Sequence, residues 1–315
     1  MPPIGPIEDW ASNYEDDPDG KRARVSNIRD FCDFSGSTVE GVLAEAENSK
    51  PGRPPTVIKN RIVNYLQHLR EGGYAETSIL VKFSHVRSFF MWNNLFLPRS
   101  IWKKKSVFND YEDTLEVKLT QAKVRRMVEV VEKPQHKAVI AFLAQTGQRQ
   151  GIVTAIKWDH IICVTKDSHA IVKVGNPYPN RKGINQNKIR SQFKFVIGPQ
   201  VLELIRRLPK QEGGWVFKIS QRQIVRVVEG AADRIGIQGI IERRKKFSGK
   251  EGMWHKIHPH TFRGYWKGRM RKSKADKDVV DFMMGHKMPY KGTHERFENR
   301  ELLRNYRKTE RNLNF

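Results

Sequence analysis

The sequence predicts a mostly α-helical protein with a small β-sheet, in which an N-terminal helical domain precedes a mixed α/β domain. Apolar residues recur at helical spacing through most of the chain, whereas residues 160–198 contain short β-branched and aromatic runs that are typical of strands. The length of 315 residues exceeds that of one average domain. A hydrophobic content of 38% is enough to build packed cores, which argues against a fully disordered chain.

The N-terminal third divides into three predicted segments. Residues 1–20 are expected to form a flexible acidic arm, because the first 19 residues contain six acidic side chains, four prolines and no basic side chain. Residues 21–102 predict a helical domain of about four helices, interrupted by the Gly/Pro-rich stretch 51–55. Few apolar residues occur in residues 103–118, which we therefore interpret as a linker between the domains.

The second domain is predicted to cover residues 119–315. Its strands are expected at residues 169–174 and 193–197, in a hairpin or a three-stranded sheet with a long basic loop between them. Residues 239–259 are predicted to form a second basic loop. The helices predicted around these strands lie at residues 136–146, 150–157, 260–272, 275–284 and 299–311.

The positive charge is concentrated in the second domain. The chain carries 58 Lys and Arg against 34 Asp and Glu, and 43 of the basic and 20 of the acidic residues lie in residues 111–315. Such an excess favours a polyanionic partner, usually nucleic acid, because neutralised phosphates release their counterions. No apolar run reaches the roughly 18 residues of a membrane span, so no membrane partner is expected. Two cysteines cannot form a disulfide framework, which favours a reducing intracellular location.

Three short motifs of the second domain matter together. T-G-Q-R at residues 146–149 follows a predicted helix, H-P-H-T-F-R at residues 258–263 comes about a hundred residues later, and M-G-H at residues 284–286 follows about twenty residues further on. This ordered set resembles the tyrosine recombinase, or phage-integrase, family over residues 119–315. The ending, with two leucines and a tyrosine within residues 302–306, looks most like archaeal and archaeal-virus members of that family.

The resemblance implies a DNA-binding (core-binding) helical domain at residues 21–102 and a recombinase catalytic domain at residues 119–315. Members of the family cut one DNA strand by attack of a tyrosine oxygen on a phosphodiester, and they form a 3′-phosphotyrosyl bond without any metal or other cofactor. The resemblance therefore implies a site-specific integrase or recombinase of a mobile element. We expect it to act on double-stranded DNA as a homo-oligomer, a tetramer on two DNA sites, in the cytoplasm of a host cell.

Four residues match the family's site by position. Arg149 and Arg263 match its two arginines, which suit a pentavalent phosphorus because each guanidinium can donate two hydrogen bonds to non-bridging oxygens. His260 is expected to act as a general acid or base, or to orient a phosphate oxygen. His286 is expected to hydrogen-bond a non-bridging oxygen.

A lysine near the predicted strands should protonate the departing 5′-oxygen. Lys188 is the preferred candidate, because it precedes Val196 at a spacing similar to that of the family, while Lys173 and Lys182 remain alternatives. Other basic residues are expected to contact the DNA backbone. These candidates lie in the linker and in the two basic loops: Lys103, Lys104, Lys105, Lys182, Arg243, Arg244, Lys245 and Lys246.

The nucleophile departs from the family pattern. The family tyrosine usually follows the second histidine by about nine residues, where this chain has His294. Tyr306 is the predicted nucleophile, with Tyr290 and His294 as alternatives. A second departure is Ile152, which stands where the family commonly has an acidic residue that orients the first arginine. The two departures leave open a catalytically inactive recombinase fold that only binds DNA, and a hairpin-forming resolvase is a third hypothesis.

Overall fold

The computed structural model describes residues 5–15, 18–47, 56–95, 97, 118–187, 192–238, 240–245, 251–286 and 297–315. The chain divides into two compact units, each of which is described by itself. The first comprises Met1–Leu115 with Ile241–Trp254, and the second comprises Glu116–Ile240 with His255–Phe315. Apart from Lys118, the predicted linker at residues 103–118 lies outside the described residues.

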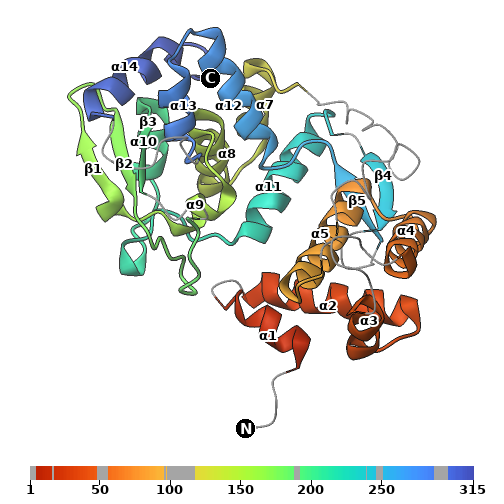
Figure 1. Ribbon diagram of the computed structural model, residues 1–315. Coiled ribbons are helices and arrows are strands. Elements are labelled where there is room, and N and C mark those ends of the chain that lie inside the picture. Colours follow the sequence, from red (N-terminus) through yellow and green to blue (C-terminus); the bar gives the residue numbers. More distant parts are fainter. Residues whose placement is uncertain are drawn as a thin grey trace. The chain divides into compact units, whose positions relative to one another are not determined.

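Helices dominate the first unit (Figure 1). The described helices are α1 (Pro6–Ser12), α2 (Pro18–Ser35), α3 (Val39–Glu47), α4 (Thr56–Glu71) and α5 (Glu76–Trp92). Strands β4 (Ile240–Lys245) and β5 (Glu251–His255) pair as a two-stranded sheet. Residues 239–259, which were predicted as a basic loop, therefore contain a pair of strands. The first strand begins with two successive β-branched residues, Ile240 and Ile241, which favour extended backbone.

Helix α1 lies within the segment that was predicted to be a flexible arm. Ile7 and Trp10 of this helix are buried in the core of the first unit. The indole of Trp10 packs edge-on against Phe89, with ring centroids 5.6 Å apart, and its Nε1 donates to Ser88 Oγ at 3.4 Å. The structure thus differs from the prediction because two apolar side chains anchor a segment whose overall composition is acidic and proline-rich.

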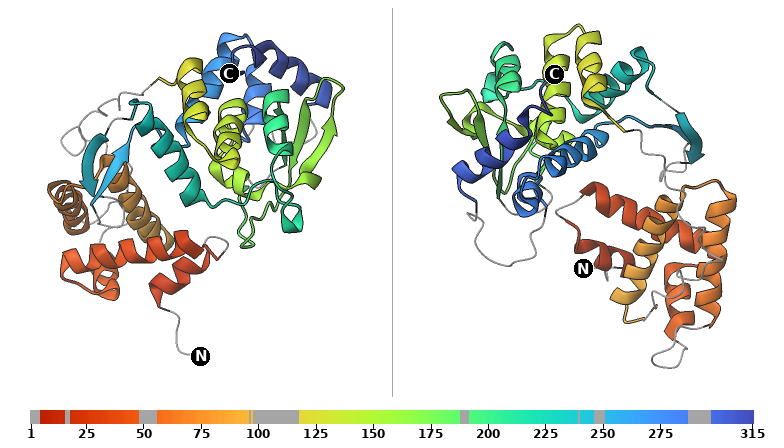
Figure 2. Two further views of the ribbon diagram at one scale, coloured as in Figure 1. Left: turned by 180° about the vertical axis from the view of Figure 1, so that it is seen from behind. Right: turned by 90° about the horizontal axis from the view of Figure 1, so that it is seen from above.

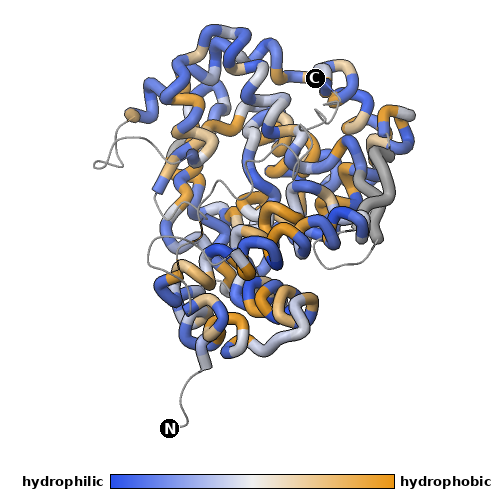
Figure 3. The backbone as a smooth tube through the Cα atoms, turned by 45° about the vertical axis from the view of Figure 1, so that its right-hand side comes forward, coloured by the Kyte–Doolittle hydropathy of each residue, from blue (hydrophilic) through white to orange (hydrophobic). Residues whose placement is uncertain are grey.

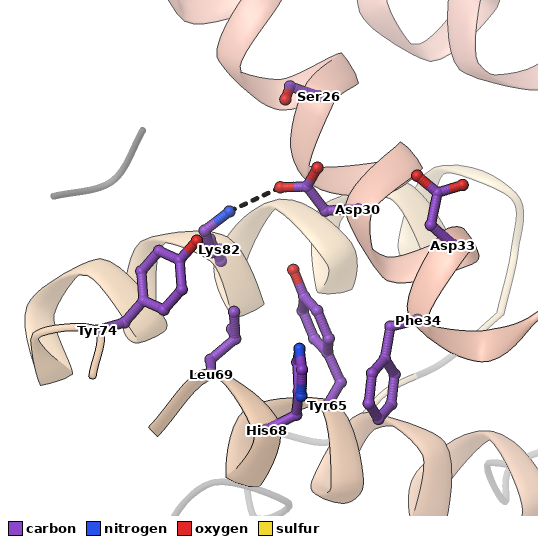
Figure 4. A pocket seen from close by; sticks show the side chains of 9 residues that line it. All are labelled: Ser26, Asp30, Asp33, Phe34, Tyr65, His68, Leu69, Tyr74 and Lys82. Atoms are coloured by element: carbon purple, nitrogen blue, oxygen red, sulfur yellow. Dashed lines mark hydrogen bonds and ion pairs between the residues drawn. The ribbon is translucent and has the colours of Figure 1, made fainter. Parts of the chain in front are cut away.

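A buried lysine lies in the core of the first unit. Lys82 of α5 donates to Asp30 Oδ2 at 2.8 Å and to Asn27 Oδ1 at 3.0 Å, and its ammonium lies 5.3 Å from the ring centroid of Tyr74. Figure 4 shows Lys82 beside Asp30 and Tyr65 in a polar pocket between α2, α4 and α5. Because these partners replace water around the ammonium, the charge is tolerated inside a helical core.

In the second unit, helices pack against a small antiparallel sheet that lies at one edge of the unit (Figure 2). The sheet has the order β1-β2-β3, from β1 (Ile161–Val164), β2 (Ala170–Val174) and β3 (Phe193–Ile197). The described α-helices of this unit are α7 (Gln121–Val130), α8 (Pro134–Thr146), α9 (Gln150–Ala155), α10 (Pro199–Arg206), α11 (Gln221–Arg234), α12 (Thr261–Lys272), α13 (Lys277–Met283) and α14 (Asn299–Glu310).

The predicted fold class is confirmed. The protein is mostly helical with a three-stranded antiparallel sheet, and the predicted strand at residues 193–197 coincides with β3. Along β2 and β3 the register is regular, with Ala170 opposite Ile197 and Val174 opposite Phe193. Blue hydrophilic and orange hydrophobic residues alternate along the helices in Figure 3, as expected for helices with one face in a core. Among the described residues, no helix is both long and apolar enough to span a membrane.

Helix α8 forms the centre of the second unit. Every residue from Ala138 to Thr146 is buried, and the helix contacts α7, α9, α10, α11, α12 and β3. It ends at Gly147, whose left-handed backbone lets its N–H donate to Leu143 O at 3.0 Å. Arg149 then caps the start of α9, so the T-G-Q-R motif is the turn between a buried helix and a short one.

Candidate active site

The guanidinium of Arg263 is buried between two helix ends. Arg263 lies in the first turn of α12 and is only 4% exposed. Its Nη1 donates to Gly147 O at 2.9 Å, and its Nη2 donates to Met284 O at 2.6 Å. Gly147 and Met284 cap the C-termini of α8 and α13, where the helix dipole concentrates negative charge. The two helix ends therefore stabilise the buried cation.

The first motif also binds the third. Arg149 is partly buried, and its Nη1 donates to Gly285 O at 3.4 Å. The neighbouring Gln148, which is 2% exposed, donates from Nε2 to Met283 O at 2.8 Å. Together with the bonds of Arg263, these contacts join three segments that are far apart in the sequence into one site.

The two arginines repel each other electrostatically. Burial lowers the pKa of Arg149. Burial and, next, the charge of Arg149 lower the pKa of Arg263 to about 10, while Asp281 opposes that shift. Both groups remain cationic at neutral pH, and no described carboxylate forms an ion pair with either of them. An anion placed between them would relieve this repulsion.

Two glycines of the motifs are required by the backbone. Gly147 and Gly285 have φ values of +61° and +63°, a region that side chains disfavour. A Cβ at Gly147 would lie 2.9 Å from the ring of Trp266, and one at Gly285 would lie 2.8 Å from the ring of Phe193. Because their carbonyls bind Arg263 and Arg149, the turns at these glycines set the position of both cations.

His260 lies at the start of the same helix as Arg263. It is the residue before α12, its ring stacks on that of His258 with an interplanar angle of 17°, and its N–H donates to His258 Nδ1 at 3.2 Å. Burial, and then the charges of Arg263 and Arg149, lower the pKa of His260. The imidazole is therefore neutral at pH 7 and suited to accept a proton.

His286 completes the group of predicted residues. Its Nδ1 lies 2.9 Å from Asp281 Oδ1, an oxygen to which Lys267 Nζ also donates at 2.9 Å. Burial lowers the pKa of His286, the hydrogen bond to Asp281 raises it, and Arg263 and Lys267 lower it further, so the net direction is down. Asp281 was missed by the sequence analysis. Its signal was a carboxylate five residues before the histidine of the G-H motif.

Tyr306 does not lie at this site. The residue is fully buried in α14, its ring faces His169 edge-on with centroids 6.0 Å apart, and a Cβ on Gly198 would be 2.8 Å from its hydroxyl. Burial raises the pKa of Tyr306. The prediction of Tyr306 as the nucleophile thus conflicts with its position here, because the amphipathic α14 directs the ring into its own domain's core together with Leu302.

The structure describes some of the other predicted residues. Lys182 is exposed in the turn after β2, and Lys173 is exposed on β2 itself. Ile152, where an acidic residue was expected, is buried in the core of the second unit. The backbone of Arg243, Arg244 and Lys245 forms part of β4. The predicted residues for which the structure describes nothing are Lys103, Lys104, Lys105, Lys188, Lys246, Tyr290 and His294.

A metal site finds no support in the described part of the chain, where no group of three His, Cys, Asp or Glu side chains is placed to hold an ion. The described side chains of the site are two guanidinium groups, held by backbone carbonyls, and two imidazoles. Such a set can stabilise charge on a phosphorus centre and move a proton. The fold, with helices packed against a small antiparallel sheet, is that of the tyrosine recombinase class.

The comparisons with known proteins agree with this class. The sequence model of the Phage integrase family matches residues 118–290, which is more than half of the chain, so the chain belongs to this family. The comparison with curated proteins gives no match. The family match contains Arg149, His260, Arg263 and His286 but ends before His294 and Tyr306.

Solved structures share the fold at low sequence identity. The Tn1549 transposon integrase in complex with a circular intermediate DNA is 14% identical, with a TM-score of 0.57, and the match covers 90% of this chain and 92% of that one. The XerH site-specific recombinase bound to difH substrate, in a pre-cleavage complex, is also 14% identical, with a TM-score of 0.55 and coverage of 90% and 78%. These likenesses extend over both units of the chain.

The glycine turn at the site predicts a contrast between two substitutions. Gly285→Ala should lower the free energy of unfolding by at least about 1 kcal/mol, because the backbone is left-handed and the new methyl meets Phe193. Gly230→Ala, inside α11 with open space around the glycine, should raise it by about 0.5–1 kcal/mol. Chemical denaturation of both variants measures the difference. Equal effects would contradict the strained turn.

Proposed function

We propose that the chain is a site-specific DNA recombinase of the integrase type, which cuts and rejoins DNA through a covalent 3′-phosphotyrosyl intermediate. The observation that supports this most is the pair of guanidinium groups, Arg149 and Arg263, held by backbone carbonyls and left without a carboxylate among the described residues. Arg263 has five N–H donors and uses two of them on carbonyls, so others remain for a phosphate.

The proposed reaction follows from the roles of these groups. A hydroxyl attacks the phosphorus of a phosphodiester, and neutral His260 accepts its proton. The growing charge on the non-bridging oxygens is stabilised by Arg149 and Arg263, and His286 is placed to hydrogen-bond one of these oxygens. The bond from phosphorus to the 5′-oxygen breaks, and a lysine, Lys188 in our prediction, supplies the proton to that oxygen. In the reverse steps, another 5′-hydroxyl attacks the phosphorus, the bond from phosphorus to the tyrosine oxygen breaks, and the DNA strand is joined. No cofactor is consumed.

The partner proposed for this reaction is double-stranded DNA, with the chain assembled as a homo-tetramer on two sites of a mobile element. Its support is the charge of the second domain and the presence of DNA in the solved structures of the similar integrase and recombinase. Exposed Lys182 is proposed as a contact to the DNA backbone. The host-cell interior, where the DNA lies, is the proposed location.

A binding-only function is the second candidate, and the position of Tyr306 favours it. If Tyr306 attacks DNA, α14 must first leave the core in which its hydroxyl is enclosed. Tyr290 and His294 precede α14 in the chain and do not require that step. If none of the three residues attacks, the same arginine pair would hold a phosphate without cutting the strand.

Replacement of Arg263 separates catalysis from binding. Arg263→Lys keeps the charge but loses the planar fork, so the rate of strand cleavage should fall by about a hundredfold or more. Affinity for the same duplex should change only a few-fold, as measured by fluorescence anisotropy at one fixed salt concentration. Arg271→Lys, at an exposed position of the same helix, is the control. A parallel loss of rate and affinity would reduce Arg263 to an ordinary phosphate contact.

DNA affinity should depend steeply on salt. Each phosphate that a basic side chain neutralises contributes about 0.9 to the slope of log affinity against log salt concentration. Lys182→Ala should reduce this slope by about one and should weaken binding equally for different sequences. Titrations of labelled duplexes between low and physiological salt measure both slopes. A slope unaffected by the substitution would remove Lys182 from the DNA interface.

A covalent trap identifies the nucleophile. The protein is mixed with nicked duplexes that tile the DNA flanking its own gene, the mixture is denatured, and any adduct is mapped by peptide sequencing. An active recombinase gives an adduct on Tyr306, Tyr290 or His294. Tyr306→Phe keeps the packing of α14, so its loss of the adduct would assign attack to Tyr306, whereas Tyr290→Phe tests the alternative in the same way. Tight, salt-sensitive binding without any adduct would support the binding-only function.

A further inference from the structure

The inference concerns the side chains that hold His286, and it rests on the proposed strand-transfer function. Asp281, in α13, contacts His286 of the G-H motif through both its backbone and its side chain. Its backbone carbonyl accepts the N–H of His286 at 3.0 Å, and its Oδ1 lies 2.9 Å from His286 Nδ1. The left-handed turn at Gly285 brings the histidine back over the last turn of the helix, so that a residue five positions earlier can reach its ring.

This contact determines which ring nitrogen can serve the reaction. An ionised carboxylate only accepts hydrogen bonds, so Nδ1 carries the proton that lies between it and Asp281. Nε2 is then the one nitrogen left for a phosphate oxygen. It can donate to that oxygen only when the ring is the doubly protonated imidazolium.

The surrounding charges oppose that imidazolium. Within the described residues, Arg263 and Lys267 of α12 lower the pKa of His286, as burial does, and only Asp281 raises it. Lys267 also donates to the same Oδ1 of Asp281 and shares its negative charge. Without the carboxylate, a histidine at this place would be a neutral ring between cations, and neither its orientation nor the nitrogen that carries its proton would be fixed.

We propose that Asp281 is a positioning residue of the strand-transfer site: it fixes the ring of His286 through Nδ1 and favours, against the neighbouring cations, the protonated form in which Nε2 donates to a non-bridging phosphate oxygen. Lys267 opposes this effect, because it donates to the same carboxylate oxygen and offsets part of its negative charge. The pair thereby sets the pH range in which His286 assists the reaction. Asp281 touches neither DNA nor the nucleophile in this role.

A titration of the DNA-free protein tests the first half of the proposal independently of any cleavage activity. Asp281→Asn keeps the shape of the side chain and removes its charge, so the NMR-detected pKa of His286 should fall below that of the parent chain. Asp278→Asn, an exposed aspartate on the same helix, should leave it unchanged. An unchanged His286 titration in Asp281→Asn overturns the proposal, whether or not the chain cuts DNA.

A variant with the opposite sign guards against a loss of folding. Lys267→Gln removes a cation that shares Oδ1, so the pKa of His286 should rise rather than fall. A merely loosened structure would move both variants in the same direction. Movement in the same direction by Asp281→Asn and Lys267→Gln therefore also overturns the proposal.

Cleavage of the trapped duplex tests the second half. Asp281→Asn should slow adduct formation by about tenfold to a hundredfold at neutral pH, the range found when a metal-bound histidine loses the carboxylate that orients it. The rate should recover in part as the pH falls, because the imidazolium is restored. In a His286→Gln background the same substitution should have no further effect. A normal rate in Asp281→Asn, or an equal loss in both backgrounds, overturns the positioning role.

The two hypotheses fail separately. If the His286 titration moves as expected but the parent chain forms no adduct with any duplex, then the proposed strand transfer is wrong and the coupling of Asp281 to His286 stands as a structural fact. If the parent chain forms the adduct and the titration does not move, the proposed function stands and the role of Asp281 is wrong.

Discussion

The burial of one guanidinium group constrains the whole second domain. Arg263 is removed from water. A buried cation lowers the stability of the folded state unless hydrogen-bond acceptors of the protein replace the lost water. Its two acceptors belong to the ends of α8 and α13, which lie more than a hundred residues apart in the chain. Both helices must therefore end at fixed points, and both ends must turn through left-handed glycines or tight caps toward α12.

The site has an excess of positive charge at its centre. Burial and, next, the charge of Arg149 lower the pKa of Arg263, and burial followed by the charges of both arginines lowers the pKa of His260. A phosphodiester would offset this positive charge with its own negative charge. Its non-bridging oxygens would also accept hydrogen bonds from N–H donors that the carbonyls leave unused. In this arrangement substrate binding and transition-state stabilisation use the same preorganised groups, which need no rearrangement when charge develops.

The sequence predicted the fold class and the arginine and histidine set because both are encoded locally. Helical spacing marked α8, α12 and α14 to within a few residues, and β-branched and aromatic runs marked β2 and β3, whereas β4 and β5 were predicted as a loop. The role of Asp281 was not visible, since it depends on a turn that brings α13 and His286 together in space. The burial of Tyr306 was not visible from the sequence for a different reason. A tyrosine on an amphipathic terminal helix has the same sequence signal whether it packs or reacts, and only its burial separates the two.

The double use of Arg263 has a consequence for how such sequences evolve. A lineage that loses its nucleophile is released from selection for cutting DNA, but it is not free to discard this arginine or the two glycines whose turns surround it. Loss of the hydrogen bonds at these residues would weaken the contacts that join the three motif segments. The motif residues would therefore be retained in an inactive descendant for the sake of the fold. Their presence alone does not distinguish an active enzyme from an inactive one.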